Sequence, residues 1–193
     1  ERGGRWRLAL GGAACGLIPF NRPPDLFIAG ALGVAALLLE RKRAWPFVAA
    51  AVGAALPFAA LNWLFFRHLG GGYFQMHEIG GFFSHPIPIG IAGLLISPGK
   101  GLLVFSPFLL LLAGRVKRPA PGDRFGLLDA CLAGGVLVTL VLLAAGDFRG
   151  GYSYGARLAS GTLPFLIWLL APVLRATSEA GLKLFAVAVL SGV

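Results

Sequence analysis

The stretch AWPFVAAAVGAALPFAALNWLFF, residues 44–66, decides the fold, because it carries no charged side chain. Its hydrophobic residues follow one another without the strict alternation that a half-buried strand requires. About 20 consecutive apolar residues cross the hydrocarbon core of a bilayer as a helix. Residues 44–66 are therefore predicted to form a transmembrane helix.

Further apolar runs lie on both sides of this stretch, with polar or basic residues between them. They cover residues 8–20, 26–39, 89–114, 125–146, 158–174 and 184–193, and the sequence SPGKG interrupts the run at 89–114. Continuous apolar runs predict helices, since a membrane-spanning barrel needs alternating segments. The expected fold is all-α, a polytopic transmembrane helical bundle with at least four full spans in one domain, 1–193. Because the chain starts without Met, it is expected to be a fragment of a longer protein.

The first two apolar runs, residues 8–20 and 26–39, are expected to be too short to cross the bilayer comfortably. The polar corner between them contains Arg22 and Asp25. Irregular backbone at membrane depth is tolerated only where protein or water covers it. The corner is therefore predicted either to dip below the outer surface or to face a protein-lined cavity, with Arg22 at the cavity mouth.

The composition supports a membrane protein. Hydrophobic residues make up 57% of the chain and charged residues only 13%, with a mean hydropathy of +0.80. A soluble domain has about 25% charged residues, so this chain lacks about half of the usual surface charge. The net charge of +9 would suit nucleic acid, but most of the 17 lysines and arginines lie in short clusters between apolar runs. The positive-inside rule explains these clusters without a nucleic-acid partner.

The basic clusters also predict the topology. The inner face receives the cations at positions 2–7, 41–43, 115–124 and 175–183, which leaves the segments 22–25, 67–100 and 147–157 at the outer face. The chain is accordingly expected to be a multi-pass protein of the plasma membrane, the inner membrane of a bacterial cell.

Several short motifs do not support a catalytic or metal site. GYSYG at 151–155 matches the nucleophile elbow around Ser153, but every histidine precedes that serine and no strand–turn–helix context is expected. His77, Glu78 and His85 lack the helical spacing that places two metal ligands on one face. No metal ligand is assigned and no cofactor is expected, although a divalent metal is left open. The small residues from Gly12 to Gly16 favour close helix packing.

A group of cations on the predicted outer side points to an anionic ligand. It consists of Arg22, Lys100, Arg149 and Arg157, with Tyr154 beside the last two. Ionisable residues near the hydrocarbon are costly and often functional. Arginine presents a fork of donors that matches phosphate, and lysine a point charge. Snorkelling of long side chains to the interface explains any one of them equally well, but as a group they favour a lipid phosphate.

The order of these motifs resembles the membrane half of bacterial glycosyltransferases with the GT-C architecture, the dolichyl-phosphate-mannose–protein mannosyltransferase-like group. The resemblance covers nearly the whole chain. It rests on Asn21-Arg22-Pro23, the basic turn at 40–43, Pro57 and Asn62, Gly72-Tyr73, the sequence SPGKGLLVFSP at 97–107, and the loop at 147–157. Phe148-Arg149 and Ala156 depart from the loop pattern of that group.

The resemblance implies transfer of a sugar, with mannose as the type case, from a polyprenyl-phosphate donor to an acceptor at the outer face. It also implies that the catalytic carboxylate lies upstream of this fragment, so that residues 1–193 shape the cavity for donor and acceptor. A transporter or lipid flippase segment is the alternative, because such proteins also build substrate sites from interrupted helices. A passive membrane scaffold is the third possibility, and it predicts no convergence of the outer cations.

Overall fold

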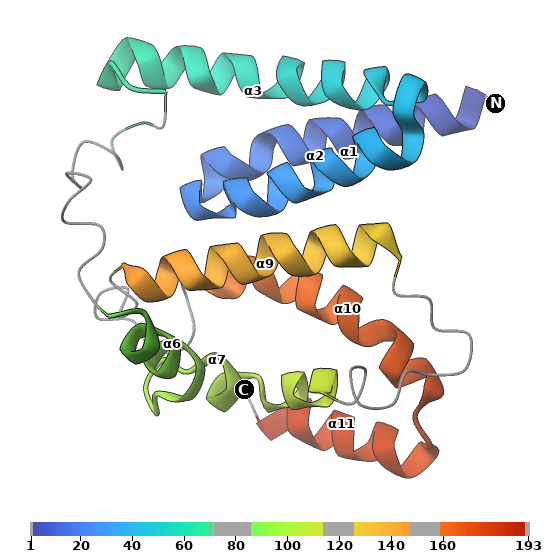
Figure 1. Ribbon diagram of the computed structural model, residues 1–193, viewed down its shortest axis with the longest axis vertical. Helices are drawn as coiled ribbons and strands as arrows, with labels where there is room; N and C mark the ends of the chain where they lie inside the picture. Colours follow the sequence, from blue (N-terminus) through green and yellow to red (C-terminus); the bar gives the residue numbers. More distant parts are fainter. Residues whose placement is uncertain (1, 70, 72–85, 114–125, 147–158, 192–193) are drawn as a thin grey trace. The chain divides into compact units, whose positions relative to one another are not determined.

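The computed structural model describes residues 2–69, 71, 86–113, 126–146 and 159–191. Every regular element in these ranges is a helix, as predicted (Figure 1). The chain divides into two compact units, Glu1–Phe83 with Ala130–Thr139, and Ser84–Asp129 with Leu140–Val193. The single domain expected over 1–193 stays a prediction, and the two units are described separately.

The first unit is built on three helices joined by tight turns. They are α1 (Arg2–Asn21), α2 (Leu26–Glu40) and α3 (Trp45–Phe66), with the 3-10 turns η1 (Pro23–Asp25) and η2 (Arg41–Arg43) between them. Gly12 of α1 lies against Phe47 of α3, and Gly16 lies against Ala51. Both contacts advance by four residues in the same direction along the two helices, so α1 and α3 run parallel. The helix between them in sequence, α2, runs in the opposite direction (Figure 1).

The packing of α1 on α3 depends on glycine. A Cβ atom on Gly12 would collide with the backbone carbonyl of Phe47, and one on Gly16 with the carbonyl of Ala51. Small residues four apart let two helix backbones approach closely, which is how helices associate in lipid. The packing role predicted for residues 12–16 is confirmed.

Local sequence explains where α3 begins and ends. Pro46 occupies its first turn, where a missing backbone N–H costs nothing. At the other end Arg67 adopts a left-handed conformation with φ of 55°, and its N–H donates to the carbonyl of Trp63. The amide of Asn62 donates to the carbonyl of Leu69 at 3.0 Å, which fixes the chain as it leaves the helix.

The second unit contains shorter helices. They are α6 (Ile87–Ile96), α7 (Leu102–Phe105), η3 (Pro107–Leu111), η4 (Ala159–Thr162), α10 (Leu163–Ala176), α11 (Glu179–Ser191) and both ends of α9 (Leu127–Ala145). Gly90 of α6 lies against the carbonyl of Ala144 in α9. The rings of Phe108 and Phe185 meet edge to face at 5.7 Å, which joins η3 to α11. The predicted interruption at 97–101 is confirmed, because α6 ends at Ile96 and α7 begins at Leu102.

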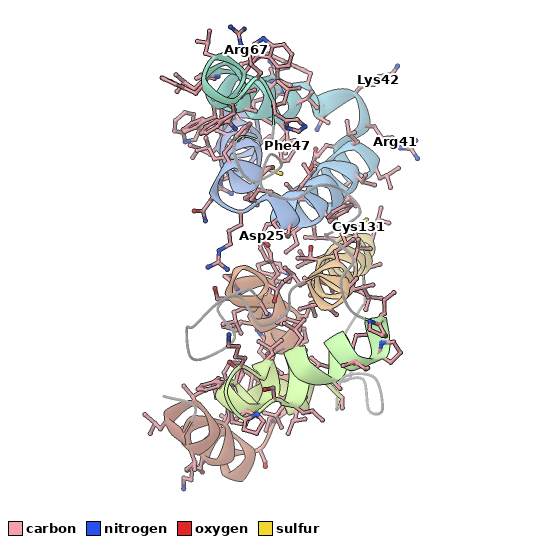
Figure 2. All side chains as sticks on the ribbon, turned by 90° about the vertical axis from the view of Figure 1, so that its left-hand side faces the viewer. Asp25, Arg41, Lys42, Phe47, Arg67 and Cys131 are labelled. Carbon is pink, nitrogen blue, oxygen red and sulfur yellow. The ribbon has the colours of Figure 1, made fainter. Side chains whose placement is uncertain are left out.

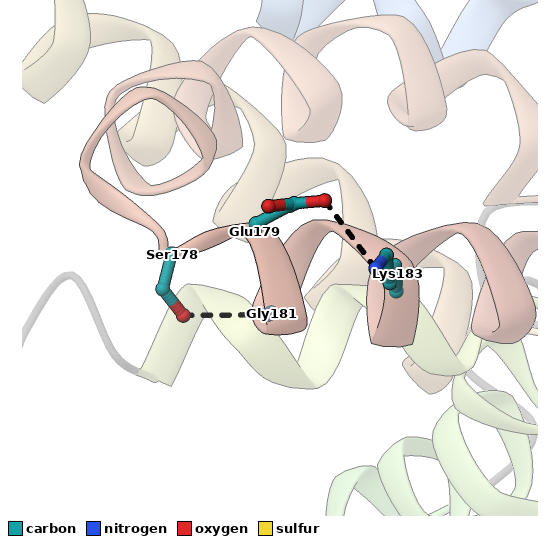
Figure 3. A network of polar contacts seen from close by, with 4 residues as sticks. All are labelled: Ser178, Glu179, Gly181 and Lys183. Carbon is teal, nitrogen blue, oxygen red and sulfur yellow. Dashed lines mark hydrogen bonds and ion pairs between the residues drawn. The ribbon is translucent and has the colours of Figure 1, made fainter.

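The start of α11 is held by polar groups (Figure 3). The hydroxyl of Ser178 accepts a hydrogen bond from the N–H of Gly181 at 3.4 Å. Glu179 and Lys183, four residues apart, form an ion pair at 3.3 Å with both side chains exposed. Exposed pairs of this kind stabilise a helix only slightly, so we assign this cluster to helix capping and to no binding role.

Three described segments are long and apolar enough to cross a membrane: Pro23–Arg43, Trp45–Phe66 and Leu127–Ala145. The first corrects the expectation that the run at 26–39 is too short, because the helical turns η1 and η2 extend it to 21 residues. The part of the chain that the structure describes thus contains three candidate spans, and the expectation of at least four full spans stays a prediction.

The apolar surface of α3 supports a membrane environment. Leu64 is 65% exposed and Phe65 is 77% exposed. Soluble proteins rarely expose large contiguous apolar patches, whereas lipid tails solvate such side chains. The length and exposure of these helices indicate a membrane protein.

Candidate functional site

The corner between α1 and α2 places two ionisable residues, Arg22 and Asp25, at one end of the first unit. Proline restricts the residue before it to extended backbone, and Arg22, before Pro23, has φ of −146° and ψ of 110°. Its N–H donates to the carbonyl of Ile18 at 3.2 Å, and its carbonyl accepts from the N–H of Asp25 at 3.0 Å. These bonds hold Arg22 half-buried at the corner.

Asp25 is the buried partner in this corner. The residue is only 5% exposed, and it interacts electrostatically with Arg22. It also precedes the first residue of α2, where the partial positive charge of a helix N-terminus favours a carboxylate. An ionisable group within an apolar unit is costly and usually has a functional role, so this corner is the strongest candidate for a binding site in the first unit.

The corner is supported by residues Ala130–Thr139 of α9, which belong to the same unit. The hydroxyl of Thr139, fully buried, lies 2.9 Å from the carbonyl of Gly135 and 3.3 Å from that of Pro24, both acceptors. A Cβ atom on Gly135 would lie 2.7 Å from the Cβ of Ala31 and 3.0 Å from the carbonyl of Phe27. The close approach of α9 fixes the backbone that carries Asp25.

Lys100 lies in the turn between α6 and α7 in the second unit. Its N–H donates to the carbonyl of Ser97 at 3.2 Å, and the N–H of Gly101 donates to the same carbonyl at 2.6 Å. A side chain on Gly101 would collide with the backbone of Ser97. The turn is therefore tightly wound, and it holds Lys100 half-buried.

The predicted cation group is represented here by two members in separate units, Arg22 and Lys100. The other three residues, Arg149, Tyr154 and Arg157, lie outside the described residues. Convergence of the group on one cavity therefore stays a prediction.

Two residues of the corner were not singled out by the sequence. Asp25 enters the sequence analysis only as part of the polar corner, and Thr139 is one polar residue in an apolar run. The signal for Asp25 was available, because an acidic residue after two prolines between apolar runs has little access to water. Thr139 gave no such signal, since its role depends on contact with a segment 115 residues away.

The described residues contain no group of three or more His, Cys, Asp and Glu side chains that could hold a metal. His77, Glu78 and His85 lie outside them. The corner itself offers a half-buried guanidinium, that of Arg22, near the buried carboxyl group of Asp25. Such a pair can hold a phosphate through the donors of the arginine fork and keep the fork oriented through the carboxylate.

No protein-family model, curated protein or solved structure matches this chain.

Proposed function

We propose that this chain is the membrane portion of a glycosyltransferase that moves a sugar from a polyprenyl-phosphate donor to an acceptor at the outer face of the plasma membrane. The observation that carries the proposal is the half-buried Arg22 beside the buried Asp25, at the junction of two apolar helices. The resemblance to GT-C mannosyltransferases, carried in part by Asn21-Arg22-Pro23, supports it from the sequence.

Arg22 would bind the phosphate and Asp25 would orient Arg22. A guanidinium has five N–H donors, so it can face a carboxylate and a phosphate together. Charge-assisted hydrogen bonds are stronger than neutral ones, and low dielectric surroundings strengthen them further. Lys100, Arg149, Tyr154 and Arg157 stay the sequence-based candidates for further contacts to the same phosphate.

The test is Arg22→Gln in the full-length enzyme, with donor affinity and turnover measured separately. Loss of one charge-assisted contact should weaken donor binding about tenfold to hundredfold, or about 1.5–3 kcal/mol. The matched control is Arg67→Gln, because Arg67 is an exposed arginine at the same end of the first unit. Unchanged donor affinity in the Arg22 variant would reduce this residue to an interfacial anchor.

A transporter or lipid flippase is the second candidate, favoured by the interruption between α6 and α7. Transporters line substrate sites with interrupted helices of this kind. Purified full-length protein in vesicles separates the two functions. A transferase forms glycosylated product from the polyprenyl-phosphate sugar, whereas a flippase moves the lipid between leaflets without consuming it.

A further inference from the structure

The first unit contains an apolar groove between α1, α2 and α3. Its volume is about 420 Å³, and almost all of its lining is carbon. Gly30 and Gly33 of α2 form part of the wall, and a Cβ atom on either would meet nothing within 4 Å. The groove therefore has room beside these glycines that no side chain of the described residues fills.

The length of the groove is close to half the thickness of the hydrocarbon core of a bilayer, which is the depth that one acyl chain fills. Its wall on α2 extends from Leu26 to Leu37, which is about 16 Å at 1.5 Å per residue. Half of a hydrocarbon core of about 30 Å is about 15 Å. Leu26 and Leu37 are 53% and 50% exposed, so both ends of this wall offer apolar surface to a ligand in the groove.

The two ends of the groove differ in charge. The end near Leu26 adjoins the corner, which carries one cation, Arg22, and one carboxyl group, Asp25. The other end, lined by Leu37, Phe47 and Val48, adjoins η2, whose three cations, all exposed, accompany a single carboxylate, Glu40.

Figure 2 shows the side chains of Arg41 and Lys42 projecting away from the helices. Arg5 and Arg7 of α1 are also exposed. They lie at the same end of the unit, since α1 and α3 run parallel and both begin there. The excess of positive charge at the η2 end therefore favours an anionic lipid headgroup there.

We propose that the groove binds an anionic phospholipid, with one acyl chain between α2 and α3 and its phosphate at Arg41 and Lys42. Basic residues next to a transmembrane helix attract anionic lipids of the cytoplasmic leaflet, and the groove adds an apolar site for the chain of the same molecule. This lipid site is separate from the donor site proposed at Arg22, since it lies at the opposite end of the helices and is independent of any transfer activity.

The experiment is a titration of the detergent-solubilised full chain with phosphatidylglycerol, followed by native mass spectrometry. Phosphatidylcholine with the same acyl chains tests the headgroup. Phosphatidylglycerol should bind at least tenfold more tightly. The double variant Arg41→Gln/Lys42→Gln should weaken it about 30-fold, from the attraction expected for two cations. Arg67→Gln is the matched control, since Arg67 is likewise an exposed arginine with positive φ, and it should bind as the wild type does.

The groove itself is tested with Gly33→Leu, which places a side chain in the open space. Phosphatidylglycerol binding should fall at least tenfold. Gly53→Leu is the control, because Gly53 also has open space around it but does not line the groove.

Equal binding of the two lipids, or wild-type affinity in Gly33→Leu, would overturn the proposal. So would a lipid-free dimer of the wild type that Gly33→Leu converts to monomer, because the occupant would then be a second copy of the chain.

Discussion

Replacing Gly16 with alanine tests the close packing of α1 on α3. The added methyl group would collide with the backbone carbonyl of Ala51. That carbonyl belongs to a continuous helix, α3, and cannot rotate away as a side chain could. The two helices must therefore move apart along their contact.

The cost can be worked out from two opposing terms. Inserting a methyl group into a tight contact costs about 1–3 kcal/mol, and a rigid backbone partner places Gly16 near the upper value. Alanine gains up to about 1 kcal/mol over glycine inside a helix. We therefore expect Gly16→Ala to lower the free energy of unfolding by about 2 kcal/mol. Gly53→Ala, which meets no atom within 4 Å, should raise it by about 0.5–1 kcal/mol.

The two variants are compared by reversible unfolding in mixed micelles, in which added sodium dodecyl sulfate lowers the helical circular dichroism signal. The opposite signs are the informative result, because any general effect of alanine on helices would move both variants in the same direction. Gly16→Ala as stable as Gly53→Ala would refute the reasoning, since it would mean that α1 and α3 do not approach closely at this point.

Two further predictions concern polar contacts. Thr139→Val should lower the free energy of unfolding by about 1 kcal/mol, because it removes the hydroxyl that reaches the carbonyls of Gly135 and Pro24. Thr139→Ser keeps the hydroxyl and should lower the free energy of unfolding by less. Equal decreases in the two variants would contradict the assignment. Ser178→Ala removes the acceptor for the N–H of Gly181. Amide hydrogen exchange should become faster in the first turn of α11 and stay the same in α3. Unchanged exchange at Gly181 would argue against the cap.

The helical class and most helix positions could be predicted from the sequence, because apolar runs and basic turns are local signals. The predicted run at 125–146 became α9, Leu127–Ala145, and the run at 44–66 became α3, Trp45–Phe66. The second segment is longer than its apolar residues alone predict, because the polar residues of Pro23–Asp25 and Arg41–Arg43 do not end the helical run. Both continue it as 3-10 helix.

The site was less predictable than the fold. The position of Arg22 at a proline-bounded corner follows from local sequence, as proline constrains the residue before it. The burial of Asp25 and the support from Thr139 depend on a contact with α9 across 115 residues. The groove at Gly30 and Gly33 was also unpredictable, because a helical glycine can equally mark a close contact, as Gly16 does.

The central claim, that the chain crosses the membrane with its basic turns inside, is tested most directly by cysteine accessibility across α3. Cys15 and Cys131 are replaced by alanine, and single cysteines are placed at Lys42 and Arg67, on either side of Trp45–Phe66. A membrane-impermeant maleimide added to intact cells should label position 67, together with a cysteine at Tyr154, and should reach position 42 only after permeabilisation. Labelling of positions 42 and 67 from the same side would contradict the account.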